Sequence, residues 1–203
     1  AEALRQHLRL DDPLPQQYGR WLVSAMQGDF GRSLLTNQPV LDEILSRLPN
    51  TVRLALAGML VSFTVGVPLG VLAAISKRSW VDSSIMLFAL TGLSMPSFWL
   101  GLLLVLVFAV NLGWFPALGD AGLKSLVLPA LTLGVAYAAI IARLTRSSML
   151  EVMRNEYVQT ARAKGLRERH VIIRHALQNA AIPVVTVVGI QFGNLLAGTV
   201  VIE

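Results

Sequence analysis

One stretch of 23 residues carries no charged side chain: Leu54-Ala-Leu-Ala-Gly-Met-Leu-Val-Ser-Phe-Thr-Val-Gly-Val-Pro-Leu-Gly-Val-Leu-Ala-Ala-Ile-Ser76. Three further charge-free runs, of 37, 18 and 27 residues, follow at 83–119, 125–142 and 176–202. A helix needs about 20 apolar residues to cross a bilayer, and a charge at its centre costs about 2.5–3.5 kcal/mol. Four such runs in one chain predict membrane-spanning helices rather than buried helices of a soluble protein.

The composition excludes several classes of protein. Hydrophobic residues make up 54% of the chain and charged residues only 14%, whereas a soluble domain is about 25% charged. A disordered chain is excluded too, because it combines low hydrophobicity with high charge. The chain has no cysteine, so disulfides, thiolate metal sites and cysteine nucleophiles are absent.

We predict an all-α, polytopic helical bundle. The 37-residue run is too long for one span and too short for two, so we expect residues 111–119 to form a return segment with Trp114 and Phe115 at the membrane interface. The domains are expected to be an extracytoplasmic amphipathic segment at 1–50 and a transmembrane domain at 51–203. The predicted spans are 54–76, 85–110, 125–144 and 182–202, with a cytoplasmic loop at 145–181.

Two pairs of glycines inside these runs, Gly66/Gly70 and Gly189/Gly193, have GxxxG spacing. This spacing lets two helices approach closely, so helix packing is their expected role.

The basic residues set the predicted orientation, because positively charged loops stay in the cytoplasm. The segments 1–53 and 111–124 each have a net charge of zero. The loops 76–83 and 143–175 together hold ten basic and four acidic side chains, a net charge of +6. We therefore expect these two loops in the cytoplasm, and the overall charge of +5 needs no nucleic acid as a partner. The predicted location is the bacterial cytoplasmic (inner) membrane, crossed several times.

The outer segment contains two expected amphipathic helices, at 16–27 and 40–48. In the first, Tyr18, Trp21 and Leu22 recur at helical spacing. Such helices can lie among lipid headgroups. The sequence leaves two readings open, a folded cap on the outer face and a docking surface for an external partner. Because residues 1–53 are expected outside without a preceding span, we also expect one span before Ala1 and at least one after Glu203.

The inner loop combines small, charged and glycine residues. Thr160, Ala161 and Ala163 are small enough to bring a short helix close to another surface, and Arg162 and Lys164 lie beside them. Gly165 suits the left-handed residue that ends a helix. A new helix is expected from Arg167 to Ala181. The residues alone leave open whether this loop docks a protein or touches anionic lipid.

The stretch Glu156-Tyr-Val-Gln-Thr-Ala-Arg-Ala-Lys-Gly-Leu166, followed by Val171-Ile-Ile-Arg-His-Ala-Leu-Gln-Asn-Ala-Ala-Ile-Pro-Val-Val185, resembles the EAA loop of ABC importer permeases. Further matches to the dipeptide, oligopeptide, glutathione and nickel branch run along nearly the whole chain, among them Ser94-Met-Pro-Ser-Phe-Trp-Leu100 and Arg146-Ser-Ser-Met-Leu150. The general pattern has Glu-Ala-Ala where this chain has Gln159-Thr160-Ala161. The resemblance implies six spans, of which this chain holds four.

The resemblance also implies a function, the import of short peptides, and a set of partners. These are a second homologous permease, two cytoplasmic ATPase subunits, an extracytoplasmic substrate-binding protein and the lipid bilayer. Nickel or glutathione import, and less closely a stand-alone secondary transporter, are the alternatives. In the family, the segment corresponding to 157–166 is the coupling helix that sits in a groove of the ATPase. The implied coupling residues are Tyr157, Thr160, Ala161, Arg162, Ala163, Lys164, Gly165 and Leu166.

Catalytic patterns are absent from the sequence. No GxxxxGK[ST] motif occurs, so we expect ATP hydrolysis in partner chains and no cofactor or metal in this one. His170 and His175 are five residues apart and are not expected on one helix face. Gln191 and Asn194 lie three apart within the last span, where polar groups face a bundle interior. Hydrogen bonding between helices and lining of the translocation path are both open for this pair.

Overall fold

A computed structural model describes residues 12–33, 36–76, 78–117 and 122–202. The described residues form helices, with one isolated β-bridge between Arg32 and Pro39. The prediction of an all-α helical bundle is therefore confirmed. The chain divides into two compact units, Ala1–Asn50 and Thr51–Glu203, and each is described by itself.

The first unit contains the amphipathic helix expected at 16–27. This helix, α2, spans Leu14–Met26, and none of its residues is buried. Tyr18 and Trp21 lie on the exposed apolar face with ring centroids 6.0 Å apart. After α2 the chain turns at Gly28 and Gly31, which have φ values of 81° and 79°. The backbone N–H of Val40 then donates to the carbonyl of Gly31 (3.0 Å), which fixes the start of the next helix.

That next helix, α3, runs without a break from Val40 to Ile75. The expectation of a separate helix at 40–48, ended near Pro49, was wrong. A proline removes one backbone donor, but its fixed φ of about −65° is itself helical, and here the helix continues past it.

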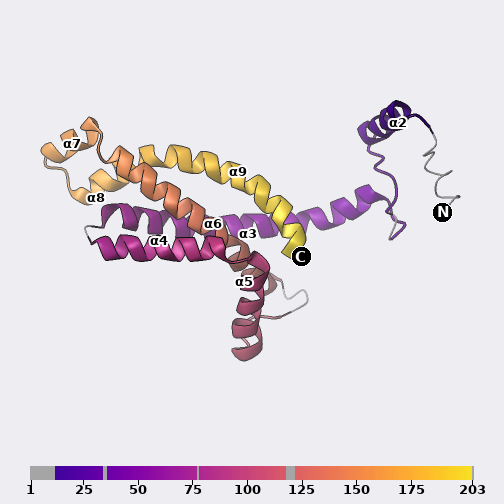
Figure 1. Ribbon diagram of the computed structural model, residues 1–203, viewed down its shortest axis with the longest axis horizontal. Coiled ribbons are helices and arrows are strands. Elements are labelled where there is room, and N and C mark those ends of the chain that lie inside the picture. The colour runs from indigo at the N-terminus through magenta and orange to yellow at the C-terminus, as the bar shows by residue number, and fades with distance from the viewer. Residues whose placement is uncertain (1–11, 34–35, 77, 118–121, 203) are drawn as a thin grey trace. The chain divides into compact units, whose positions relative to one another are not determined.

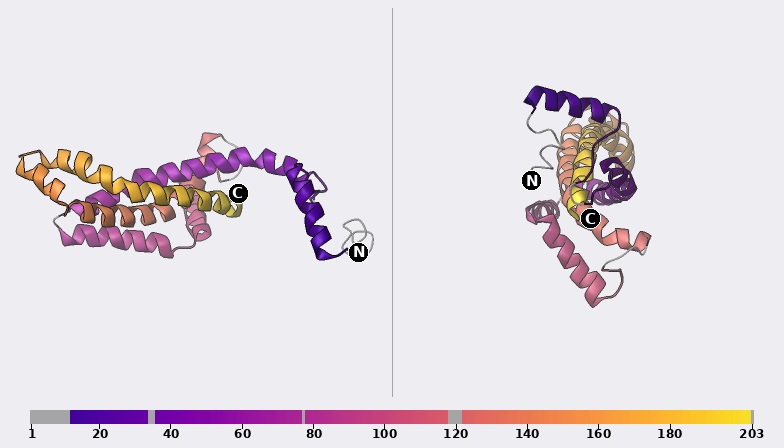
Figure 2. Two further views of the ribbon diagram at one scale, coloured as in Figure 1. Left: turned by 90° about the horizontal axis from the view of Figure 1, so that it is seen from above. Right: turned by 90° about the vertical axis from the view of Figure 1, so that its right-hand side faces the viewer.

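The second unit is built around α6, Leu123–Val152. Three helices run alongside α6: the later part of α3, α4 (Ser79–Ser94) and α9 (Gln178–Ile202) (Figure 1, Figure 2). The helix α6 extends well beyond the predicted span end at residue 144. Among the residues that the structure describes, three helical stretches are long and apolar enough to cross a membrane, or four if the bent pair described next counts as one span.

The segment predicted as one span at 85–110 is sharply bent in the structure. The segment forms α4, then α5 (Ser97–Leu104), and then the π-helix η1 (Val105–Asn111). The two halves meet at an angle of 102°, and α5 points away from the other long helices (Figure 1). The residue before a proline is driven out of the α region, and Met95, which precedes Pro96, has φ −80° and ψ 128°. Pro96 therefore explains the break.

The second unit buries small side chains and exposes large ones. Its buried residues are mostly small, with alanine the most frequent and glycine, serine and threonine among them, whereas many leucines, phenylalanines and valines on its surface are exposed. Transmembrane helices pack in this way, because lipid is as apolar as leucine and small residues allow close backbone contact. A Cβ on Gly66 would lie 2.7 Å from the carbonyl oxygen of Ala138 in α6. The packing role of Gly66/Gly70 is confirmed.

The second glycine pair behaves differently. A Cβ on Gly189 or Gly193 would meet no atom of the described chain within 4 Å. Among the described residues, the expected close packing at Gly189/Gly193 is therefore not found.

Candidate functional site

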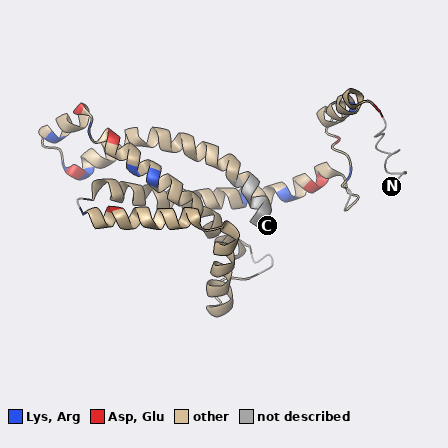
Figure 3. Ribbon diagram, in the orientation of Figure 1, with Lys and Arg blue, Asp and Glu red and all other residues tan. Residues whose placement is uncertain are grey.

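The inner loop begins where α6 ends. After Val152 the chain turns through residues 153–155 and enters α7, Glu156–Ala163. This helix lies at one end of the second unit, beside α8 (Glu168–His170) (Figure 1). The charged residues of the second unit gather toward this end (Figure 3). The short helix and the clustered charge occur together, as the sequence predicts.

α7 packs on its own chain through an apolar cluster. Val158 and Val171 have no exposed surface, Ala161 is 6% exposed, and Val152 packs against the three of them. The sequence suggested that Ala161 brings α7 close to another surface. Within this chain, its small side chain allows α7 to approach the helix that contains Val171.

Polar contacts hold α7 in the same position. Arg162 donates from Nη2 to Glu168 Oε1 (2.8 Å) and from Nε to both carboxylate oxygens (3.2 and 3.3 Å). This hydrogen-bonded pairing with Glu168 raises the pKa of Arg162 above its ordinary value. Tyr157 donates its hydroxyl to the backbone carbonyl of His175 (3.3 Å). Arg162 was expected to bind a partner surface, but its guanidinium is engaged within the chain.

Gly165 ends the segment as predicted. Its φ is +74°, a left-handed conformation that costs other L-residues about 1–2 kcal/mol. The N–H of Leu166 reaches back to the carbonyl of Ala161 (3.4 Å), and that of Gly165 to Arg162 (2.9 Å). The turn therefore reverses the chain sharply between α7 and α8.

The remaining predicted coupling residues form the exposed side of α7 and its turn. Tyr157 is 42% exposed, and its apolar ring edge is open to solvent despite the bond from its hydroxyl. Five further residues of the predicted set are exposed: Thr160, Ala163, Lys164, Gly165 and Leu166. Of the eight predicted residues, the structure thus brings six to one accessible surface, while Ala161 is buried and Arg162 is half-buried.

The helix after the turn is continuous with the last long helix. α8 passes into the π-helix η2 (Val171–Leu177), and η2 passes into α9. The expected helix from 167 to 181 is therefore present, but it does not stop before the predicted span at 182. A second apolar cluster, of Ala74, Met149, Ala176 and Ala180, joins the ends of α3, α6 and α9 at this level. The loop is thereby fixed to three long helices.

His170 and His175 lie closer together than the sequence indicated. Their rings are 5.7 Å apart and nearly edge to face. The expectation that residues five apart lie on different faces was wrong, because a π-helix has i→i+5 geometry. Within the described residues, no group of three or more His, Asp or Glu side chains could hold a metal ion.

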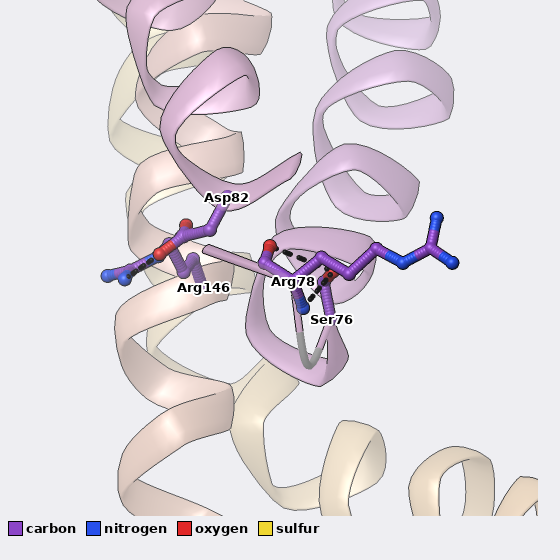
Figure 4. Close-up of polar contacts among 4 residues, drawn as sticks. All are labelled: Ser76, Arg78, Asp82 and Arg146. Carbon is purple, nitrogen blue, oxygen red and sulfur yellow. Dashed lines mark hydrogen bonds and ion pairs between the residues drawn. The ribbon is translucent and has the colours of Figure 1, made fainter. Parts of the chain in front are cut away.

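An ion pair between α4 and α6 was not predicted from the sequence. Arg146 donates from Nε and Nη2 to the two carboxylate oxygens of Asp82, both at 2.5 Å (Figure 4). The partners are 64 residues apart. The sequence feature that could have pointed to this pair is that each partner is a charged residue close to the end of a charge-free run.

Gln191 and Asn194 contact each other in α9. Asn194 Nδ2 donates to Gln191 Oε1 (2.6 Å), as expected for amides three apart on one helix face. Asn194 is exposed in this chain. Within the described part of the chain, neither amide side chain is hydrogen-bonded to another helix.

Sequence comparison adds the family. The pattern of the family described as "Binding-protein-dependent transport system inner membrane component" matches residues 66–203. The chain belongs to this family of membrane transport components. The resemblance to ABC importer permeases is thereby confirmed. Family membership and the long apolar helices together make the chain an integral membrane protein.

Several relatives within the family carry the name glutathione transport system permease protein GsiC. That of Escherichia coli (strain K12) is 46% identical over 202 residues, which are 100% of this chain and 66% of the relative. That of Salmonella paratyphi A is 45% identical over 200 residues, which are 98% of this chain and 65% of the relative. The chain thus spans about 66% of the length of the curated relatives that it matches.

Proposed function

We propose that this chain is the membrane permease subunit of an ATP-driven importer of short peptides, and that the exposed side of α7 receives motion from a separate ATPase subunit. The partners are a second, similar permease, two cytoplasmic ATPase subunits and an extracytoplasmic binding protein. In this function the subunit itself is non-catalytic and needs no cofactor. α7 lies on the cytoplasmic side of the bacterial inner membrane.

The observation that supports coupling most is that α7 is firmly seated on its own chain and yet exposed on its outer side. Its inner side is held by the Val158–Ala161–Val171 cluster and by the Arg162–Glu168 pair. Its outer side presents Thr160, Ala163 and Lys164. A helix that is packed rigidly on its neighbours transmits a displacement to them, whereas a loosely attached helix would move without displacing them. Switching between two arrangements of packed helices requires such a connection.

The substrate is proposed from the relatives. They are named for glutathione, a short peptide, so glutathione is the first ligand to test within the peptide class. Gln191 and Asn194 are proposed to line the translocation path, because neutral amides can bind a peptide backbone without the cost of placing a charge in the membrane. The exposure of Asn194 in the single chain is consistent with this position.

The test uses the complete transporter reconstituted in vesicles with its binding protein. Ala163→Glu and Lys164→Glu place a negative charge on the exposed side of α7, and Ser79→Glu places one at an exposed position on α4. We expect the two α7 variants to lower both co-purification of the ATPase subunit and glutathione-dependent ATP hydrolysis at least fivefold, and Ser79→Glu to change neither. Unchanged recovery and hydrolysis in both α7 variants would contradict the coupling role. If ATP hydrolysis responds to other short peptides but not to glutathione, the substrate is a short peptide other than glutathione.

A further inference from the structure

The helix α6 has two unlike interfaces. Toward α3 it is locked, because a Cβ on Gly70 would lie 2.5 Å from the carbonyl oxygen of Ala142 and 2.6 Å from Thr145 Cβ. Toward α4 the contact is looser, since a Cβ on Gly92 would meet its nearest atom, Ala139 Cβ, at 3.7 Å. Ordinary van der Waals contact permits small sliding of packed helices, as in shear motions. At these glycines, α3 therefore packs more closely on α6 than α4 does.

The Asp82–Arg146 pair spans the looser interface. Its two parallel N–H···O bonds fix the mutual orientation of the groups as well as their distance. The side chains of Arg146 and Asp82 are 30% and 26% exposed, so the pair is partly shielded from water. Among the residues that the structure describes, no other side-chain hydrogen bond joins α4 to α6.

Arg146 sits on the part of α6 that is fixed to the inner loop. Met149, one turn later, is fully buried against Ala74, Ala176 and Ala180, and Val152 packs against the Val158 cluster of α7. A displacement of α7 therefore carries Arg146 with it. Asp82, by contrast, lies in the first turn of α4.

The link before α4 is short and locally bonded. Arg78 N donates to Ser76 Oγ, and Ser76 Oγ donates to the carbonyl of Arg78, each across 3.3 Å (Figure 4). Both hydrogen bonds join Ser76 to Arg78, and neither reaches α6. Among the described residues, the ion pair is the side-chain hydrogen-bonded contact that joins this end of α4 to α6.

We propose that Asp82 and Arg146 are positioning residues that make α4 follow the displacement of the coupling helix. This rests on the proposed function of α7. Without the ion pair, the ATPase still binds α7 and hydrolyses ATP, but α4 no longer follows the movement of α7. The expected defect is hydrolysis without matching transport.

The experiment measures ATP hydrolysed per substrate imported, together with ATPase recovery, in the reconstituted transporter. Asp82→Asn and Arg146→Gln are expected to keep recovery and hydrolysis within twofold of the parent and to lower uptake at least fivefold. The charge-swapped double variant Asp82→Arg/Arg146→Asp is expected to restore at least half of the uptake. Arg146→Lys keeps the charge but loses the two-pronged geometry, so intermediate uptake is expected. Arg143→Gln removes an exposed arginine one turn earlier on α6 and serves as the matched control.

Two results would overturn the proposal. One is an unchanged ratio of hydrolysis to uptake in both single variants. The other is a swapped variant that assembles at the parent level and transports no better than the singles. Failure of the underlying coupling role has a different signature, because ATPase recovery would then be insensitive to Ala163→Glu whatever the state of the ion pair.

Discussion

Ser62 of α3 directs its hydroxyl toward the backbone carbonyl of Gly134 in α6, with 3.0 Å between the oxygens, and shares it with the carbonyl of Gly58 in its own helix (2.7 Å). The hydroxyl is buried at the crossing of the two helices. This contact shows how closely the backbones approach, since a side-chain oxygen only one carbon from the backbone reaches the neighbouring helix.

The first prediction concerns this hydrogen bond. Ser62→Ala should destabilise the subunit by about 0.6 kcal/mol, the average for hydrogen bonds between membrane helices. Thr64→Ala is the matched control, because the Thr64 hydroxyl is exposed and bonds only within α3. Unfolding of the detergent-solubilised subunit in increasing SDS measures both. Equal stability of the two variants would show that the bond to Gly134 contributes nothing.

The second prediction compares two glycines. Gly70→Ala places a Cβ 2.5 Å from the carbonyl oxygen of Ala142, whereas Gly189→Ala meets nothing within 4 Å. Overpacking typically costs about 1–3 kcal/mol, so Gly70→Ala should lower stability by this amount and Gly189→Ala should leave it unchanged. The same unfolding in increasing SDS measures the stability of both variants. A harmless Gly70→Ala would mean that α3 and α6 are less tightly packed than described.

The third prediction concerns the turn after α7. Gly165 has φ +74° and open space where a Cβ would lie, so its replacement acts through backbone strain alone. Gly165→Val should destabilise the loop by about 1–2 kcal/mol, and Gly165→Asn by less, because asparagine tolerates this conformation. Hydrogen exchange at the Leu166 amide measures local opening. Similar protection of this amide in the valine and asparagine variants would be incompatible with a left-handed turn.

The fourth prediction concerns the Arg162–Glu168 pair. The pair lies at the surface and is partly exposed, and such pairs contribute about 0.2–1 kcal/mol, so Arg162→Gln should have a small, salt-sensitive effect. Pairing raises the pKa of Arg162, so its contribution is complete below the unfolded-state pKa and is lost only as the pH rises past the folded-state value. Both lie above the range in which membrane proteins are handled.

Arg162 therefore stays charged from about pH 6 to pH 9. The stability difference between the parent and Arg162→Gln should be constant over this range. Thermal unfolding of both proteins at several pH values measures this difference. A difference that grows toward high pH would contradict the assignment.

Much of the fold could be predicted from the charge-free runs, because a buried charge in lipid is costly wherever it occurs. The break at Pro96 could not. Pro129 and Pro183 lie inside continuous helices, so proline alone does not distinguish a bent span from a straight one.

The candidate site shows a similar division. The left-handed turn at Gly165 could be predicted because it is a local property of the backbone. The burial of Ala161 could not, because a small residue allows close approach on either side of a helix, and only the position of Val171 decides which. The Asp82–Arg146 pair joins residues far apart in sequence and depends on the register of α4 against α6, which no local pattern specifies.

Cysteine cross-linking in the intact transporter tests most directly whether α7 touches a separate ATPase. The chain has no cysteine, so Ala163→Cys and Lys124→Cys each introduce a single thiol in this subunit, the second at the opposite end of α6. With a short bifunctional maleimide and an ATPase that carries surface cysteines, Ala163→Cys should give a cross-linked permease–ATPase product and Lys124→Cys should give none. A cross-link from Lys124→Cys, or none from Ala163→Cys while the complex is intact, would contradict this account.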